Sequence, residues 1–249
     1  MIEHRVSING IGVNAAYSER AVREIFLPLL RRLDVLRQKK GGRVLAMLAA
    51  PPGAGKTTLL SFLERLSNEE PELTPIQGIG MDGFHRRQEY LLTHFAERNG
   101  QQIRMVDIKG APVTFDLGRL MESVRKVAAG GTCSWPRYDR LLHNPVEDAL
   151  RVDGEIVLLE GNYLLLDADG WRGLSAFADY TISVTADEAL LRDRLIERRI
   201  KTGVDREPAT RFVDFSDMPN VRLCLEKTLP ANLRLRLGED GDYSQIQYR

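Results

Sequence analysis

The sequence predicts an α/β protein in which helices cover both faces of a mainly parallel sheet. Short, wholly apolar runs alternate along the chain with longer segments of helical spacing, and Val44 to Ala49 and Ile156 to Leu159 are the clearest of these runs. Strands that are buried on both faces have this composition. A glycine-rich turn, residues 50 to 58, joins the first run to an apolar-rich segment that suits a helix. Together these patterns predict three layers, with helices on either side of the sheet.

The glycine-rich turn reads A-P-P-G-A-G-K-T-T, which is the pattern of a phosphate-binding P-loop. We therefore predict a P-loop NTPase fold, a three-layer α/β/α arrangement that binds ATP with Mg²⁺. Lys56 would reach the β- and γ-phosphate oxygens, and the hydroxyl of Thr57 would hold Mg²⁺. Ala50 replaces the usual opening glycine, and an ordinary glycine-rich turn is the alternative. The backbone N–H groups expected to converge on phosphate are those of Gly53, Ala54, Gly55, Lys56, Thr57 and Thr58.

Periodicity and helix-breaking residues place the other elements. Residues 1 to 14 look irregular, and apolar residues at helical spacing predict a helix from about Ala15 to Lys39. We interpret residues 101 to 114 and Trp135 to Pro145 as long loops, which in compact domains are usually functional. No repeat or linker is visible, so the whole chain, residues 1 to 249, reads as a single domain. Further strands are expected at Thr74 to Met81 and Asp179 to Val184, with an edge pair at 232 to 237 and 244 to 248. Helices are expected at 86 to 98, Asp116 to Ala129, Ala186 to Ile200 and, interrupted near Pro219, Pro208 to about Leu229.

The overall composition excludes several classes of function. Thirty-five basic and thirty-five acidic residues cancel, so no global field favours nucleic acid or an anionic membrane, and a charged substrate would need a local basic patch. The chain has no apolar run of about 18 residues and no signal-peptide pattern. Cys133 and Cys224 are too few for a disulfide framework, which predicts free thiols in a reducing compartment. We expect a soluble cytoplasmic protein without nucleic-acid or membrane partners; the sequence leaves open whether it forms a homodimer.

Two carboxylates follow predicted strands, at the sheet edge where α/β proteins gather their ligands. Asp82 could orient an acceptor hydroxyl and take its proton during phosphoryl transfer, or it could cap the helix expected at 86. Gly83 beside it would allow another group to approach closely. Glu160 ends an apolar strand, where Mg²⁺ beside a P-loop is its natural partner and a structural, turn-capping role is the alternative. Thr57 and Glu160 are therefore the expected metal ligands.

Histidines supply further candidates. His85 and His143 lie in loops among polar neighbours, which for His143 include Arg137 and Tyr138. A lone histidine is more often structural than a ligand, and His94, on a helix face with apolar neighbours, reads as structural.

The helix expected at 186 to 200 is dense in arginine. Arg194 and Arg198 are four residues apart and share a face, so they could clamp the charge of a transferring phosphoryl group. A solvated charged face is the alternative, and nearby acidic residues partly support it. Gly203 and the polar residues after it suit an arginine-rich lid, at about residues 192 to 217, that closes over the site.

Six motifs follow one another in the chain, and together they resemble the P-loop kinase group of uridine kinase, phosphoribulokinase and bacterial pantothenate kinase. The resemblance runs from about Val44 to Leu223. It is nearest to bacterial proteins labelled as fructose-transport-system kinases or as nucleoside/nucleotide-kinase-like proteins. The motifs are A-P-P-G-A-G-K-T, M-D-G-F-H, K-G-A-P-V-T-F-D, P-R-Y-D-R-L-L-H-N-P-V, I-V-L-L-E-G-N-Y-L-L-L-D and the arginine-rich helix.

The resemblance implies a role for each matching position. Asp82 corresponds to the catalytic acidic residue that faces the acceptor hydroxyl, and Glu160 to the acid that closes the Walker-B strand. Lys56 and Thr57 correspond to the phosphate and Mg²⁺ residues, and Arg194 and Arg198 fall in the lid helix. Residues that contact the substrate correspond to Asp116, Tyr138 and His143, which together with Asp82, His85 and Arg137 make up the expected acceptor pocket.

We therefore expect an ATP-dependent kinase that phosphorylates a hydroxyl of a small molecule, such as a sugar, a nucleoside or a pantothenate-like compound. A nucleotide-dependent regulatory ATPase without an acceptor is the main alternative. Asp82 and the polar segment 135 to 145 disfavour it, because a switch protein needs no acceptor pocket. A degenerate P-loop that serves as a binding module is the third possibility.

Overall fold

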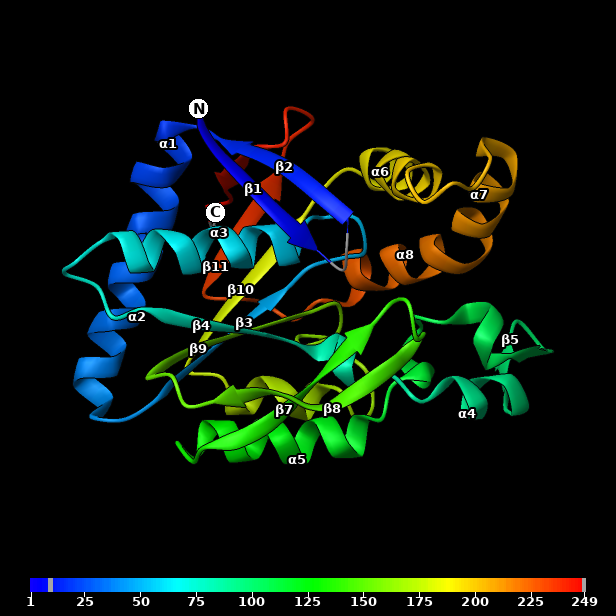
Figure 1. Ribbon diagram of the computed structural model, residues 1–249, viewed down its shortest axis with the longest axis horizontal. Coiled ribbons are helices and arrows are strands. Elements are labelled where there is room, and N and C mark those ends of the chain that lie inside the picture. Colours follow the sequence, from blue (N-terminus) through cyan, green and yellow to red (C-terminus); the bar gives the residue numbers. More distant parts are fainter. Residues whose placement is uncertain (9–10, 248–249) are drawn as a thin grey trace.

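The computed structural model describes residues 1–8 and 11–247, which form a central sheet with helices on both faces (Figure 1). Within these residues the main sheet has the strand order β12-β11-β10-β3-β9-β4, and every neighbouring pair is parallel except β11 with β12. The mainly parallel sheet and the edge strand pair predicted from the sequence are thus confirmed, and the edge pair is antiparallel. The strands are β3 (Val44–Ala49), β4 (Ile76–Gly80), β9 (Ile156–Gly161), β10 (Tyr180–Thr185), β11 (Leu233–Leu237) and β12 (Tyr243–Gln245); Tyr248 lies outside the described residues.

The central strand β3 shows why this sheet is apolar on both faces. All of its residues are buried, and successive side chains point to opposite sides. Its odd-placed residues, Val44, Ala46 and Leu48, pack in a core with α2 (Leu27–Lys40) and α3 (Lys56–Glu69). The residues between and after them, Leu45, Met47 and Ala49, pack in a second core with α5 (Leu117–Ala128), which lies on the other side of the sheet in Figure 1.

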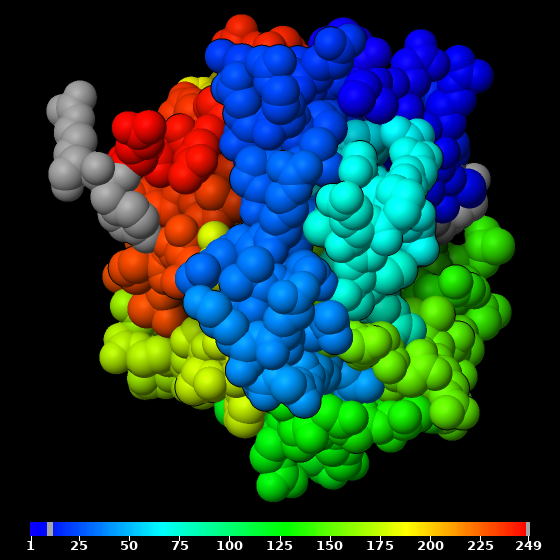
Figure 2. Space-filling model, turned by 90° about the vertical axis from the view of Figure 1, so that its left-hand side faces the viewer, coloured from blue at the N-terminus to red at the C-terminus, as the bar shows by residue number. Residues whose placement is uncertain are grey.

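The N-terminal segment differs from the prediction. Where irregular chain and then helix were expected, the strands β1 (Ile2–Ile8) and β2 (Ile11–Tyr17) pair antiparallel as a hairpin. The hairpin packs on α3, where His4 Nε2 is 3.1 Å from Ser61 Oγ. The helical run begins after Ser18, whose hydroxyl accepts the N–H of Ala21. It comprises α1 (Glu19–Ala21), the π-helical turn η1 (Val22–Phe26) and α2, and Figure 2 shows it as a column along one face of the molecule.

Two further segments are hairpins where the sequence predicted loop or helix. The expected loop from Trp135 to Pro145 is the end of a hairpin made by β7 (Cys133–Asp139) and β8 (Asn144–Val152). The helix expected at 86 to 98 stops early, as α4 (Gln88–Thr93), and β5 (Phe95–Arg98) then pairs with β6 (Gln101–Arg104). Asn99 and Gly100 both have positive φ and form the two-residue turn between these strands, so N-G is a hairpin turn here and not a helix stop.

The other predicted helices are confirmed, with one break. The helix expected at 208 to 229 contains the π-helical turn η6 just before Pro219. Short 3-10 turns occupy much of the expected loop at 101 to 114. The remaining elements are α6 (Glu188–Ile200), α7 (Arg206–Phe212), η6 (Val213–Asp217), α8 (Met218–Lys227) and the 3-10 turns η2 (Met81–Phe84), η3 (Met105–Ile108), η4 (Pro112–Thr114) and η5 (Arg172–Phe177).

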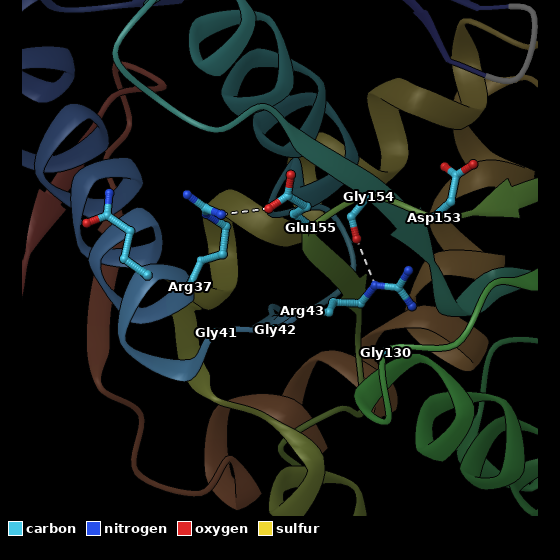
Figure 3. Close-up of a pocket in the computed structure, with 9 residues that line it drawn as sticks. Arg37, Gly41, Gly42, Arg43, Gly130, Asp153, Gly154 and Glu155 are labelled. Atoms are coloured by element: carbon cyan, nitrogen blue, oxygen red, sulfur yellow. Dashed lines mark hydrogen bonds and ion pairs between the residues drawn. The ribbon is translucent and has the colours of Figure 1, made fainter.

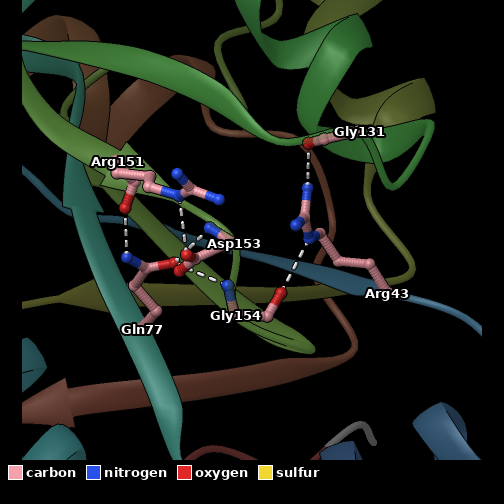
Figure 4. A network of polar contacts seen from close by, with 6 residues as sticks. All are labelled: Arg43, Gln77, Gly131, Arg151, Asp153 and Gly154. Atoms are coloured by element: carbon pink, nitrogen blue, oxygen red, sulfur yellow. Dashed lines mark hydrogen bonds and ion pairs between the residues drawn. The ribbon is translucent and has the colours of Figure 1, made fainter.

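Polar contacts close the amino-terminal end of the sheet, around a recess of about 310 Å³ (Figure 3). Arg37 pairs with Glu155 at 2.6 Å, which joins α2 to the start of β9. Arg43 donates to Gly154 O at 2.7 Å and to Gly131 O at 2.6 Å. Figure 4 shows that Gln77 of β4 completes this network by bonding the backbone of Arg151, Asp153 and Gly154. These groups are occupied with one another, so we interpret the network as structural.

Cys133 and Cys224 are free thiols, as predicted. Among residues 1–8 and 11–247 no helix combines the length and the apolar composition that a membrane crossing requires.

Gly83→Ala tests how closely the β7–β8 hairpin is packed on η2. A Cβ on Gly83 would lie 2.1 Å from the carbonyl oxygen of Pro136, a backbone atom that cannot swing aside. We expect the variant to lose about 3 kcal/mol of unfolding free energy, measured by urea denaturation. Gly42→Ala is the matched control, because a Cβ there meets nothing within 4 Å. A loss at Gly83 no larger than at Gly42 would contradict the packing described here.

Candidate active site

The P-loop lies between β3 and α3 and has the backbone conformation that its glycines allow. Gly53 and Gly55 adopt φ values of +85° and +79°, in the left-handed region that side chains rarely occupy. Lys56 begins α3, so the N–H groups of the first helical turn have no helical partner and can bind an anion. Ala54 departs from the expected cradle, because its N–H donates to Pro51 O at 3.2 Å and is committed to the turn.

Two residues from distant parts of the chain hold this loop from outside. The hydroxyl of Tyr243, in edge strand β12, donates to Ala54 O at 3.1 Å. Arg194 of α6 lies against the loop: a Cβ built on Gly55 would be 3.2 Å from its Nη2 atom. The candidate lid arginine therefore reaches the loop that the sequence predicts to bind phosphate. The sequence did not predict that Tyr243 contacts the P-loop, because this contact depends on how strand β12 pairs at the edge of the sheet.

The expected metal ligands Thr57 and Glu160 contact each other directly. The Thr57 hydroxyl donates to Glu160 Oε1 at 2.8 Å, from the first turn of α3 to the end of β9. Glu160 is 6 % exposed, and this burial raises its pKa although the nearby charge of Lys56 opposes the effect. Within the described residues no three His, Cys, Asp or Glu side chains gather into a metal site. A hydroxyl and one carboxylate nevertheless suit Mg²⁺ beside a P-loop, since that ion takes most of its ligands from phosphates and water.

Asp82 lies in η2, directly after β4, and reaches the same edge of the sheet as Glu160. The two strands run parallel, with Gly80 opposite Glu160 in register, so both carboxylates follow neighbouring strand ends. Burial alone would raise the pKa of Asp82, but nearby positive charge outweighs burial and lowers it. The groups responsible are His85, Lys56, Arg140 and Arg198. Asp82 is therefore a carboxylate at neutral pH.

His85 and Tyr138 stack beside Asp82. The His85 ring lies 3.9 Å from that of Phe115 and 5.1 Å from that of Tyr138, and its Nδ1 is 2.8 Å from Asp82 O. Burial lowers the pKa of His85, so at neutral pH the ring is neutral and the lysine and arginines supply the positive charge. Burial also raises the pKa of Tyr138 to about 12, which keeps its hydroxyl a donor.

The remaining expected pocket residues are Asp116, His143 and Arg137. Asp116 caps α5, where its Oδ1 accepts the Arg119 N–H at 3.2 Å. His143 sits at the hairpin tip with φ of 52°, and its side chain is exposed, as is that of Arg137 on β7. In the described part of the chain no hydrogen bond, ion pair or ring contact joins any of these three side chains to Asp82. Their roles in binding an acceptor stay predictions.

Lys109 and Arg140 belong to the site although the sequence analysis did not single them out. Lys109 donates to Gln88 Oε1 at 2.8 Å and to His143 O at 2.9 Å, so it fastens the hairpin tip to the segment before η4. Burial lowers the pKa of Lys109 to about 8. The charge of Arg140 acts on Asp82 and on Glu160. Both residues lie inside motifs quoted above, K-G-A-P and Y-D-R-L-L-H, and that placement is the signal that could have found them.

Two recesses lie outside this cluster. The one shown in Figure 3 is at the amino-terminal end of the sheet, opposite the P-loop, where α/β sheets do not place their ligands. The other, of about 580 Å³, is mainly apolar and lies on η4, the start of α5 and the segment before η5, with Phe115 and Trp171 in its lining. We place the site at neither, because the polar groups converge at the carboxyl ends of β3, β4 and β9.

Comparison with known proteins agrees with this geometry. The sequence profile described as Phosphoribulokinase / Uridine kinase family matches residues 45–231. The "Uncharacterized protein YggC" of Escherichia coli is 41 % identical over 239 residues, which cover 96 % of this chain and 97 % of that protein. A pantothenate kinase of Shewanella loihica is 27 % identical over 96 % of this chain and 87 % of its own. The crystal structure of a "putative fructose transport system kinase" from Silicibacter superposes with a TM-score of 0.69 at 30 % identity, covering 81 % of this chain and 98 % of that one.

The lowered pKa of Lys109 predicts how stability changes with pH. Between about pH 8 and the ordinary value of 10.5 the unfolded chain binds more protons than the folded chain, so stability rises with pH in this window. Lys109→Met removes that contribution. We expect wild type to gain unfolding free energy relative to the variant between about pH 8 and pH 10, measured by urea denaturation. Lys39→Met, at an exposed lysine, is the control that should show no such trend. A gap between wild type and Lys109→Met that stays constant with pH would contradict the assignment.

Proposed function

The chain belongs to the Phosphoribulokinase / Uridine kinase family, and we propose that it is an ATP-dependent kinase that transfers the γ-phosphoryl group to a hydroxyl of a small molecule. One observation carries the proposal: Asp82 lies at the sheet edge where Lys56 and the Thr57–Glu160 pair also emerge. A carboxylate at this edge, close enough to feel the charge of Lys56, can orient an acceptor hydroxyl beside the bound phosphates. Sugars, nucleosides and pantothenate-like compounds are the acceptor classes that the family suggests.

The donor side consists of the P-loop and α6. The amides of the loop and of the first turn of α3 bind the phosphates, and Lys56 contacts the β- and γ-oxygens. Thr57 and Glu160 hold Mg²⁺, which neutralises charge on the phosphates when it is bound. Arg194, which already lies against Gly55, and Arg198 supply positive charge where the transferring group becomes more negative.

The acceptor side is built around Asp82. Its carboxylate orients the acceptor hydroxyl and takes the proton as the new bond from oxygen to phosphorus forms, while the bond from the β,γ-bridging oxygen to phosphorus breaks and ADP leaves. The lowered pKa makes Asp82 a weak base. Its main contribution is therefore to position the hydroxyl, which is the larger part of catalysis in phosphoryl transfer. Tyr138 and His85 form the adjacent wall.

The segment at about residues 192 to 217 acts as a lid that closes over the bound substrates. Its pieces are tied together as one unit: Arg192 pairs with Asp214 at 2.6 Å, and Arg206 pairs with Glu197 at 2.5 Å. Closure would exclude water, which competes with the acceptor for the phosphoryl group.

Acceptor-dependent release of ADP is the direct test of this function. We expect MgATP turnover to rise when the right member of a panel of sugars, nucleosides and pantothenate is added, and Lys56→Ala to abolish that turnover. Lys39→Ala, at an exposed lysine, should behave as wild type. ADP release that ignores every acceptor would instead indicate a regulatory ATPase.

Asp82→Asn separates the acceptor side from the donor side. The amide cannot accept the hydroxyl proton, so we expect turnover to fall by about 10²-fold or more. The Kd for MgATP, measured by calorimetry, should stay within about twofold of wild type, because the P-loop is intact. Asp148→Asn, at an exposed position on β8, controls for the loss of one negative charge. Turnover close to wild type in Asp82→Asn would remove this residue from the mechanism.

A further inference from the structure

The β7–β8 hairpin is fastened to the segment 80–85, which carries the candidate base. The indole N–H of Trp135 donates to a backbone carbonyl of that segment at 2.8 Å. The backbone of Pro136 lies against Gly83, and the ring of Tyr138 lies 5.1 Å from that of His85. Because β7 is fixed at these points, Arg140, the first residue after the strand, emerges beside the candidate site.

Arg140 forms no ion pair among residues 1–8 and 11–247, although its charge acts on Asp82, Glu160 and Asp217. Asp139, the nearest carboxylate in sequence, accepts the N–H groups of Leu141 at 2.8 Å and of Leu142 at 3.0 Å, so it is committed to the turn. In the part of the chain that the structure describes, Arg140 makes no hydrogen bond and no ion pair, and its side chain is exposed. Its guanidinium therefore keeps its N–H donors for a ligand.

Other arginines around the same hairpin do have partners. Arg151, at the far end of β8, pairs with Asp153 at 2.9 Å. Arg119 of α5 forms an ion pair with Glu147, in the middle of β8. Arg137, on β7 itself, is exposed and, like Arg140, makes no side-chain hydrogen bond or ion pair with the described residues. Arg140 differs from it in acting on the Asp82 carboxylate.

Positive charge accumulates around Asp82 from three separate elements. Lys56 comes from α3, Arg198 from α6 and Arg140 from the hairpin, and each acts on the carboxylate of Asp82. Arg198 is exposed at the rim and, like Arg140, makes no hydrogen bond or ion pair with the described residues. Like charges repel at short range, so holding these groups together costs free energy unless anions lie between them. The carboxylates in this cluster are Asp82, the largely buried Glu160 and Asp217, and Asp217 also pairs with Arg199 at 3.7 Å. The cations therefore outnumber the anions.

The phosphates of the donor nucleotide would neutralise only part of this positive charge. Lys56 follows the P-loop glycines and Arg194 lies against Gly55, so both face the phosphates of the nucleotide. Arg140 follows β7 on the hairpin that also carries Tyr138, whose ring lies 5.1 Å from that of His85 beside Asp82, and its charge also acts on Arg198 of the lid. A guanidinium at this position is within reach of an acceptor that contacts Asp82. A guanidinium is well suited to this task, since it binds carboxylates and phosphates with two parallel hydrogen bonds.

We propose that the acceptor is an anionic alcohol, and that Arg140 binds its phosphate or carboxylate group while Asp82 faces its hydroxyl. The inference rests on the proposed kinase function and narrows its substrate class. It also assigns Arg140 a role in specificity, because a neutral alcohol would leave the guanidinium without a counter-ion.

Matched pairs of acceptors test this proposal. D-Ribulose 5-phosphate is compared with D-ribulose, and pantothenate with pantothenol, with ADP release as the readout and MgATP at saturation. The two pairs distinguish a phosphate from a carboxylate as the recognised group. We expect kcat/KM for the best anionic acceptor to exceed that for its neutral counterpart by about 10-fold or more.

Variants of Arg140 then locate the effect. Arg140→Gln should raise the KM for the anionic acceptor by about 10- to 100-fold, the value of one charged hydrogen-bond pair, and leave the KM for ATP within about twofold. Arg140→Lys should restore part of the loss. Arg151→Gln is the matched control, because it removes an exposed arginine from the far end of the same hairpin. Thermal unfolding of each variant checks that the fold is unchanged.

Two results would overturn the proposal. The first is a best acceptor that is neutral and is used at least as well as its anionic counterpart. The second is an Arg140→Gln variant that loses kcat equally for charged and neutral acceptors or raises the KM for ATP, which would place the arginine on the donor side. Both of these leave the kinase function standing, whereas ADP release that no acceptor stimulates would refute the kinase function itself and this inference with it.

Discussion

The parallel pairing of β3, β9 and β4 is the constraint on which the rest of the site depends. Because the three strands run in one direction, their carboxyl ends meet at one edge, and the P-loop, Glu160 and Asp82 follow these ends in neighbouring order. The register is as important as the direction: Gly80 lies opposite Glu160, and a Cβ on Gly80 would be 3.3 Å from a Glu160 carboxylate oxygen. A shift by one residue would turn each of these side chains to the opposite face of the sheet.

The two carboxylates at this edge differ because their surroundings differ. Glu160 is almost completely buried, and burial raises its pKa; a cation bound next to Thr57 would compensate for that cost. Asp82 lies among cations from several elements, which lower its pKa despite the same burial effect. Environments that push the pKa values of two neighbouring carboxyl groups apart are typical of sites in which the two groups have separate tasks. The tasks that we propose here are metal binding for Glu160 and contact with the acceptor for Asp82.

Sequence reasoning captured the parts of this molecule that local patterns control. Apolar runs located β3 and β9, and the P-loop followed from its glycines, because both signals are contained in a few consecutive residues. The β7–β8 hairpin was missed because its pairing depends on strands that carry exposed polar residues and a bulge after Trp135. Tyr243 was missed for a similar reason, since it contacts a residue 189 positions away. Whether residues 1 to 249 form a single domain, and which residues contact an acceptor, remain predictions.

The zero net charge of the chain does not conflict with an anionic acceptor. Long-range attraction depends on the total charge, but binding depends on the few groups within about one Debye length, near 10 Å, of the ligand. Many of the basic residues form ion pairs, as Arg192 does with Asp214, so they contribute little to the field at the site. At the sheet edge Arg140 and Arg198 form no ion pair or hydrogen bond with the described residues, and their charges act on Asp82 and Asp217. The local basic patch that a charged substrate would need is therefore formed by two long-range elements, the hairpin and the lid, that meet above Asp82.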